Sequence, residues 1–191
     1  MAVASTMLPL GTPIPLFSLP DLEGQIVCVD DFWDARALLV IFLCPHCPYV
    51  RHVRGEIAGL AREYRPRGVA TVAINSNDPA QYPQDGPEGM RQEAEEAGYS
   101  FPYLFDESQQ VAKAFMAACT PDFFLFDEAR TLAYRGQLDD SRPRNERPVT
   151  GRDLRAALDA LLEGRPVPAE QAPSIGCSIK WKPGNQPAHF G

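Results

Sequence analysis

The clearest feature of the sequence is a succession of apolar and amphipathic stretches between residues 37 and 74. The run ALLVIFL at 37–43 is short and bounded by turn-forming residues, which is typical of a strand buried on both faces. From Pro48 onward apolar residues recur at steps of three and four, as in an amphipathic helix, until Pro66 and Gly68 end the pattern. A second apolar run, VATVAI, follows at 69–74. Strand, helix and strand in this order predict a parallel, right-handed crossover.

The rest of the chain supplies elements for the faces and edges of such a sheet. The pattern predicts an extended lead-in at 9–20, a turn at 21–24, an edge strand at 25–29, helices at 87–97 and 109–118, a short strand at 103–105, and a hairpin of strands at 122–126 and 131–134. A last helix follows Thr150, which is expected to cap it. This order predicts an α/β fold formed by residues 1–164, with helices on both faces of a central sheet. The proline-rich residues 165–191 predict an irregular C-terminal arm packed on that domain.

Composition and charge narrow the functional class. The chain has 191 residues, 45% of them hydrophobic and 23% charged, which is the balance of an ordinary globular protein. Its net charge of −7 disfavours nucleic acid and anionic membrane surfaces as partners. No stretch approaches the roughly 20 apolar residues of a membrane-spanning helix, and the first residues lack the basic and apolar regions of a signal peptide. A cytoplasmic location is therefore expected, and nothing in the sequence indicates an oligomeric state.

The strongest local motif is Cys44-Pro-His-Cys47-Pro48, between the buried strand and the amphipathic helix. The chain holds five cysteines, an odd number that does not suggest a secreted disulfide framework. Proline is favoured at the first helical position, so Cys47 is expected at the N-cap, close to unpaired backbone N–H groups and the positive end of the helix dipole. Both favour a thiolate, and no acidic residue occurs between residues 35 and 55. Cys47 is therefore the predicted nucleophile, provided that solvent reaches its sulfur.

Two other interpretations of the motif compete with this one. The cysteines could be buried, inert side chains at the end of a strand. A zinc site could combine Cys44, His46 and Cys47 with Cys119 or Cys177, but the sequence has no second C-x-x-C or H-x-x-H pair. We therefore expect no metal, and without a glycine-rich nucleotide motif we expect no other cofactor. His46 is expected to face solvent and to tune the thiolate.

A second motif, Thr120-Pro121, stands directly before the predicted strand at 122–126. Proline cannot donate to a β-ladder, so it should occupy the first strand position or a bulge. The bond that precedes it could be cis, although a trans bond is the more common case. From the residues alone, both alternatives stay open.

Four stretches of the chain carry a resemblance to a known family. They are FLCPHCPYV at 42–50, CTPDFFLFD at 119–127, YRGQLDDSRP at 134–143 and GCSIKWKPGN at 176–185. Together they resemble the thioredoxin superfamily, and within it the peroxiredoxin-like group of the alkyl hydroperoxide reductase/thiol-specific antioxidant (AhpC/TSA) class. The resemblance implies a thioredoxin-like fold with a central mixed β-sheet and a cis-proline at Pro121 that faces the active cysteine. It places Cys47 where thioredoxins carry their nucleophilic cysteine.

The expected activity is thiol–disulfide exchange. Cys47 would attack a disulfide as a thiolate, and Cys44 is the first candidate for the resolving thiol. Cys119 lies beside the proposed cis-proline and is either a resolving thiol or a packing residue. Cys177 lies in an apolar part of the arm, and it is either a resolving thiol docked over the site or a structural clasp, the latter being slightly preferred.

The predicted substrate site combines Pro48 and His46 with Thr120 and Pro121, whose backbone would present itself to an extended peptide. The polar residues 139–142 could line a substrate groove, although a solvated loop is the simpler interpretation. The expected partners are a protein disulfide or a peroxide and a cellular thiol reductant. Two alternative functions are a peroxidase that passes through a sulfenic acid and a non-catalytic binding module that keeps the fold.

Overall fold

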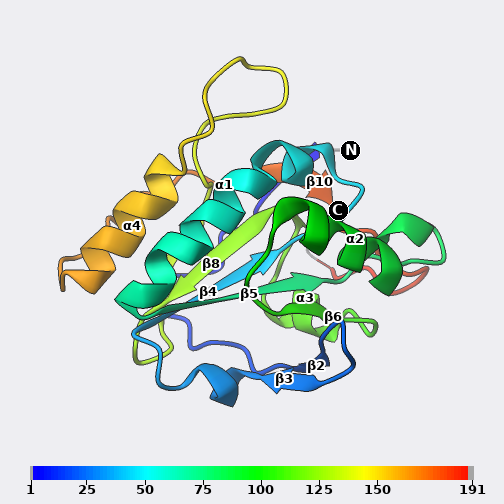
Figure 1. The fold of residues 1–191 in the computed structure, drawn as a ribbon, viewed down its shortest axis with the longest axis horizontal. Helices are drawn as coiled ribbons and strands as arrows, with labels where there is room; N and C mark the ends of the chain where they lie inside the picture. The colour runs from blue at the N-terminus through cyan, green and yellow to red at the C-terminus, as the bar shows by residue number, and fades with distance from the viewer. Residues whose placement is uncertain (1, 189–191) are drawn as a thin grey trace.

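A five-stranded mixed sheet forms the centre of the protein in the computed structural model, which describes residues 2–188 (Figure 1). Its strands lie in the order β6-β5-β4-β8-β9. Their bounds are β4 Ala37–Phe42, β5 Val69–Asn75, β6 Tyr103–Phe105, β8 Asp122–Phe126 and β9 Leu132–Gly136. Strands β4, β5 and β6 run parallel, whereas β8 is antiparallel to both β4 and β9. The predicted parallel crossover through the helix after Cys47 is therefore confirmed.

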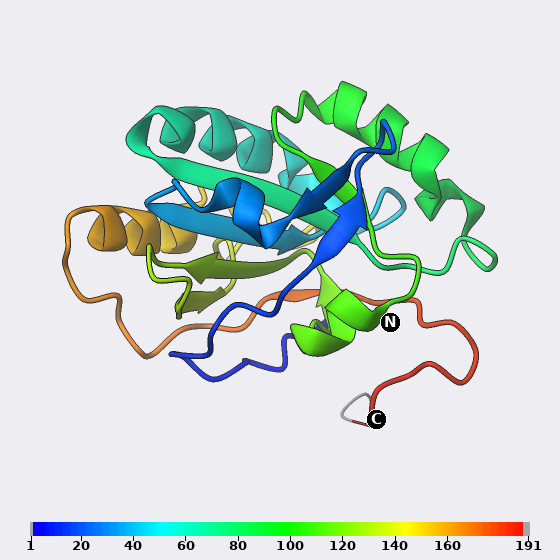
Figure 2. The ribbon, with the colours of Figure 1, turned by 90° about the horizontal axis from the view of Figure 1, so that it is seen from below.

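Four α-helices accompany the sheet. Their bounds are α1 Pro48–Tyr64, α2 Pro87–Ala97, α3 Gln110–Ala114 and α4 Arg152–Leu162, and 3-10 turns occur at Val29–Phe32, Arg65–Arg67 and Pro83–Asp85. Figure 2 shows α1, α2 and α4 on one side of the sheet, and α3 with the N-terminal segment and the C-terminal arm on the other. Within residues 2–188, no helix has the length and apolar character needed to cross a membrane.

Strand β4 is buried along its whole length, because successive side chains point into the two cores on opposite faces of the sheet. Leu39 and Ile41 pack in the core beneath α1, α2 and α4. Leu38 and Val40 pack in the other core, where Phe115 makes edge-on contacts with neighbouring aromatic rings. The alternation explains why a continuous apolar run predicted this strand correctly.

A separate three-stranded sheet joins both ends of the chain to the segment before Pro121. It consists of β1 (Ala2–Ala4), β10 (Ile175–Ser178) and β7 (Cys119–Thr120). Strand β10 lies in the middle and is antiparallel to both neighbours. The sequence pattern predicted no strand in the C-terminal arm, since four residues among prolines carry little periodicity. The structure therefore adds an ordered strand to a segment expected to be irregular.

The remaining strands form a hairpin, β2 (Ser18–Pro20) with β3 (Ile26–Cys28), across the predicted turn. The helix predicted at 109–118 is shorter than expected. It ends at Ala114, Met116 adopts a positive φ of 51°, and the chain enters β7 at Cys119. The apolar residues that suggested a longer helix instead lead the chain into the strand before Pro121.

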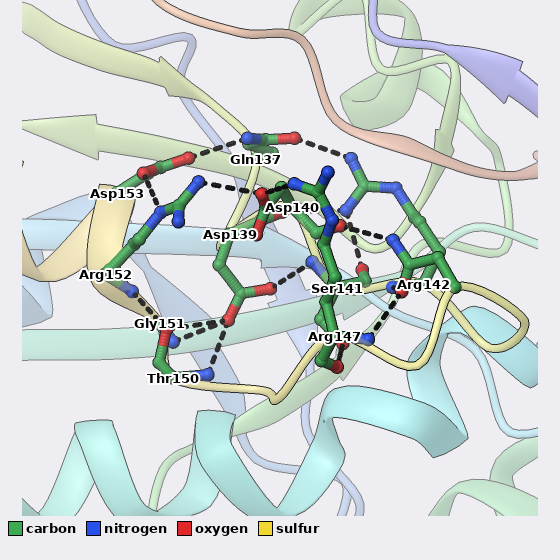
Figure 3. A network of polar contacts seen from close by, with 11 residues as sticks. Gln137, Asp139, Asp140, Ser141, Arg142, Arg147, Thr150, Gly151, Arg152 and Asp153 are labelled. Atoms are coloured by element: carbon green, nitrogen blue, oxygen red, sulfur yellow. Dashed lines mark hydrogen bonds and ion pairs between the residues drawn. The ribbon is translucent and has the colours of Figure 1, made fainter.

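The N-cap of α4 is Gly151, not Thr150 as the sequence had indicated, and it has a φ of +65° that favours glycine. The Thr150 hydroxyl still accepts a long hydrogen bond, at 3.4 Å, from the N–H of Arg152. The turn is held instead by the buried carboxylate of Asp139, which accepts the backbone N–H groups of Thr150 at 2.6 Å and Gly151 at 2.7 Å (Figure 3).

Candidate active site

Cys47 lies at the N-cap of α1, directly after the loop that leaves β4. Pro48 occupies the first helical position, and the backbone N–H of Arg51 donates to the Cys47 carbonyl at 3.0 Å. The side chain of Cys47 therefore lies beside the free amides at the positive end of a 17-residue helix. The structure places the predicted nucleophile where the sequence indicated.

Three cysteines, Cys44, Cys47 and Cys177, meet around Thr120; we call them the thiol cluster. The Cys47 sulfur lies 3.0 Å from the Thr120 carbonyl oxygen, to which the protonated thiol donates. The Cys44 sulfur lies 3.1 Å from the Thr120 hydroxyl. Cys177 reaches the cluster from β10, where it is the register partner of Thr120, and it packs against the core that contains Cys44 and Cys47.

The hydrogen bonds of the thiol cluster concentrate negative charge on one sulfur. Donation from the thiols of Cys177 and Cys44 holds the pKa of Cys47 well below its ordinary value, although burial opposes the effect. The Cys47 hydrogen bond, followed by burial, raises the pKa of Cys177. Burial raises the pKa of Cys44. Of the three sulfurs, Cys47 is therefore the thiolate.

Solvent does not reach the Cys47 sulfur directly, contrary to the expectation from the sequence. Cys44 and Cys47 are both 0% exposed, and β10 lies against them through Cys177. Cys177 itself is partly exposed. The partly exposed residue of the thiol cluster is thus not the one with the acidic sulfur.

His46 is only partly exposed, with 17% of its side chain accessible to solvent. Its ring stacks on Tyr82 with centroids 4.8 Å apart, and its Nδ1 is bonded to the buried carboxylate of Asp85. Nδ1 also lies 3.9 Å from the sulfur of Cys44. The environment of His46 therefore fixes the loop between the two motif cysteines.

The peptide bond between Thr120 and Pro121 is cis. It places the Thr120 carbonyl and hydroxyl next to the two motif cysteines. Cys119, one position earlier, is not part of the thiol cluster: its buried thiol donates to the Pro121 carbonyl at 3.6 Å. The structure thus brings together Thr120, Pro121 and Cys47 but places Cys119 in a packing position.

Two acidic residues near the site were not identified from the sequence. Asp85 accepts the backbone N–H of His46 at 3.0 Å and the side-chain amide of Asn77 at 2.8 Å, so it ties the loop before α1 to the end of β5. Glu93 is buried on α2, and burial raises its pKa to about 7. The sequence offers no indication of the contact of Asp85, but Glu93 follows the buried Met90 by three residues and so shares its helical face.

Cys44, His46 and Asp85 are the one metal-ligand group found among residues 2–188, with their ligand atoms within 4.8 Å of one another. Three donors are fewer than the four of a structural zinc site. Both carboxylate oxygens of Asp85 already accept hydrogen bonds from His46 and Asn77. A metal ion would have to break these bonds, so the arrangement fits a hydrogen-bonded loop better.

The polar residues at 139–142 have two roles. Asp139 and Ser141 are buried and hold the loop before α4 (Figure 3). Residues of the same segment also line a hollow next to the cis-proline, together with Tyr49, His52 and Ile175. A solvated loop is therefore too simple a description of this segment.

The fold and the site together define a class of protein. A thioredoxin-fold structure, the thioredoxin domain of a thiol-disulfide oxidoreductase from Bacteroides vulgatus, matches 67% of this chain and 88% of its own, with a TM-score of 0.58 and 18% identity. The protein has the thioredoxin fold. The chain belongs to the AhpC/TSA family, which matches residues 10–135.

Two further proteins are similar to the chain. A crystal structure of an uncharacterized conserved protein from Geobacillus kaustophilus is 59% identical, covers 96% of this chain and 97% of its own, and has a TM-score of 0.93. The thiol-disulfide oxidoreductase ResA of Halalkalibacterium halodurans is 26% identical over 112 residues, which are 59% of this chain and 59% of that protein.

Proposed function

We propose that the protein is a thiol–disulfide oxidoreductase that uses Cys47 as its nucleophilic thiolate. The observation that carries the proposal is the N-cap position of the Cys47 sulfur, with two further cysteines packed in the same cluster. A thiolate at a helix N-terminus is the species that attacks disulfides, and a second thiol in contact with it completes the exchange. The structure supplies both within one cluster.

The reaction transfers two electrons between the thiol cluster and a partner. In the oxidised protein Cys47 forms a disulfide with an adjacent cysteine. Two partner thiols reduce that bond: they become a disulfide, the adjacent cysteine takes up one proton as a thiol, Cys47 remains as a thiolate, and one proton goes to solvent. In the reverse direction the protein reduces a partner disulfide. The proposed partners are accordingly a protein disulfide and a cellular thiol reductant.

Family membership favours a peroxidase as the second candidate function. In that reaction the Cys47 thiolate would attack a peroxide oxygen and become a sulfenic acid, and the leaving alkoxide would take a proton from solvent to become an alcohol. An adjacent thiol would then form a disulfide with Cys47 and release water. The groups that lower the pKa of Cys47 are thiols, the Thr120 hydroxyl and the Val50 amide, none of which is cationic. The site therefore supports disulfide exchange more directly.

A comparison of two assays tests the proposal. The full-length protein should catalyse reduction of a protein disulfide by a small dithiol faster than it consumes hydroperoxide, and Cys47→Ser should abolish the exchange. Cys28→Ser is the matched control, because Cys28 lies outside the thiol cluster on β3 and is also a free cysteine. Faster peroxide consumption would favour the second candidate. If the protein shows neither activity and Cys47 is alkylated with the pH profile of a free cysteine, the protein is a non-catalytic binding protein.

A further inference from the structure

Cys177 is the one residue of the thiol cluster that is partly exposed. Cys44 and Cys47 are fully buried, whereas Cys177 is partly exposed. Direct attack by Cys47 on an external disulfide would require β10 to leave its place.

Strand β10 is held too firmly for this to be the ordinary route. It pairs with β1 on one side and β7 on the other. Ser174, just before it, is buried, donates its hydroxyl to the Gly136 carbonyl at 2.7 Å and accepts the Ser5 N–H at 2.9 Å. Ile179, just after it, is also buried. Displacement of Cys177 would break contacts on both edges and at both ends of the strand.

Gly176 brings the two strands unusually close. A Cβ added at this position would lie 2.0 Å from the Thr120 carbonyl oxygen, so only glycine fits. The same oxygen lies 3.0 Å from the Cys47 sulfur. The close approach therefore sets the next residue, Cys177, against Cys47.

We propose that Cys177 is the catalytic cysteine that exchanges with partner thiols and disulfides, and that it does so through a disulfide with the buried Cys47. This inference rests on the proposed function. A partner thiolate attacks the Cys177 sulfur of the Cys47–Cys177 bond, forms a mixed disulfide with Cys177, and the bonding electron pair leaves on Cys47. A second thiolate of the partner then attacks the partner sulfur that is bonded to Cys177. The two partner sulfurs leave joined as a disulfide, and the released Cys177 thiolate takes a proton from solvent.

The division of labour follows from leaving-group chemistry. A disulfide breaks fastest when the departing sulfur is a stable thiolate, and the incoming thiol needs access to the sulfur that it attacks. Cys47 meets the first condition and Cys177 the second. In the reverse direction Cys47 is the nucleophile that attacks a mixed disulfide held on Cys177. Cys44, whose sulfur lies beside the Thr120 hydroxyl in the same cluster, takes no part in the exchange.

Oxidation of the full-length protein with oxidised glutathione, followed by acid quenching and peptide mapping, tests this assignment. The wild-type protein should form a Cys47–Cys177 disulfide. Cys47→Ser should accumulate a glutathione mixed disulfide on Cys177. In Cys177→Ser the Cys47 sulfur should react at least about tenfold more slowly, because attack then needs local opening of about 1.4 kcal/mol or more.

Two results would overturn the inference while leaving the proposed function intact: a Cys44–Cys47 disulfide in the wild-type protein, or a Cys177→Ser variant that exchanges at the wild-type rate. A wild-type protein in which Cys47 enters no disulfide would overturn the proposed function itself. The two failures are therefore distinguishable in one set of maps.

Gly176→Ala gives a second readout that keeps all three thiols. The added methyl group must push β10 from β7, so the pH midpoint for alkylation of Cys47 should rise and formation of the Cys47–Cys177 disulfide should slow by about tenfold or more. Gly59→Ala on α1 is the matched control, because a Cβ there meets no atom within 4 Å. An unchanged alkylation profile in folded Gly176→Ala would contradict the positioning role.

Discussion

Glu93 should give the protein a pH-dependent stability that can be removed by one substitution. Its carboxyl group is 3% exposed, and burial raises its pKa from 4.5 to about 7, although the Tyr103 hydroxyl donates to Oε2 at 3.0 Å. The folded state therefore holds this proton between about pH 4.5 and 7, where the unfolded state has lost it. Stability from this group is present at low pH and is lost as the pH rises. The difference corresponds to about 3 kcal/mol.

Urea unfolding of wild-type protein and Glu93→Gln at about pH 4 and about pH 8 measures this contribution. Glutamine carries no titrating proton. The free energy of unfolding of the variant, relative to that of wild type, should therefore be about 3 kcal/mol higher at about pH 8 than at about pH 4. Comparison of the two proteins cancels the titrating groups that do not interact with Glu93. Glu95→Gln changes the same group on the exposed face of α2 and should behave as wild type. If the free energies of unfolding of wild type and Glu93→Gln differ by the same amount at both pH values, the reasoning is refuted.

Three further substitutions, with Gly59→Ala as a control, test the packing of the fold. Asp139→Asn removes the charged acceptor of the backbone amides before α4 and should lower the free energy of unfolding by about 1–3 kcal/mol in urea. Phe115→Ala empties the centre of the aromatic core beneath β4 and should lower it by about 3–5 kcal/mol, with a matching fall in the thermal midpoint. Gly89→Ala should destabilise the protein although alanine favours helices, because its Cβ would lie 1.9 Å from the Gln84 carbonyl oxygen. Gly59→Ala meets no such contact and should be neutral or stabilising by up to about 1 kcal/mol in the same assay.

The elements that the sequence predicted well are those with a local physical cause. The crossover from β4 through α1 to β5 follows from apolar periodicity, and the position of Cys47 follows from the preference of proline for the first helical position. Glu93 could have been identified in the same way, from its spacing to Met90. These predictions needed no knowledge of distant contacts.

The parts that the sequence did not predict depend on pairing across long separations. Strand β10 has four residues and pairs with a two-residue strand more than 50 positions earlier, so neither carries a detectable period. The contact of Asp85 with His46 spans 39 residues and arises from the loop after β5. The burial of Cys47 has the same origin, because residues from β7 and β10 enclose it.

The strand that buries Cys47, contrary to its expected accessibility, also contributes to its acidity, although burial itself raises the pKa of Cys47. The strand that shields the sulfur carries Cys177, the group that lowers the pKa of Cys47 most strongly. A site with β10 removed would expose Cys47 and, by losing this donor, make it a weaker leaving group. Access and acidity therefore cannot both be maximal at Cys47 in this fold. Placing the exposed position on one sulfur and the charge on its neighbour resolves the conflict, provided that the two can form a bond.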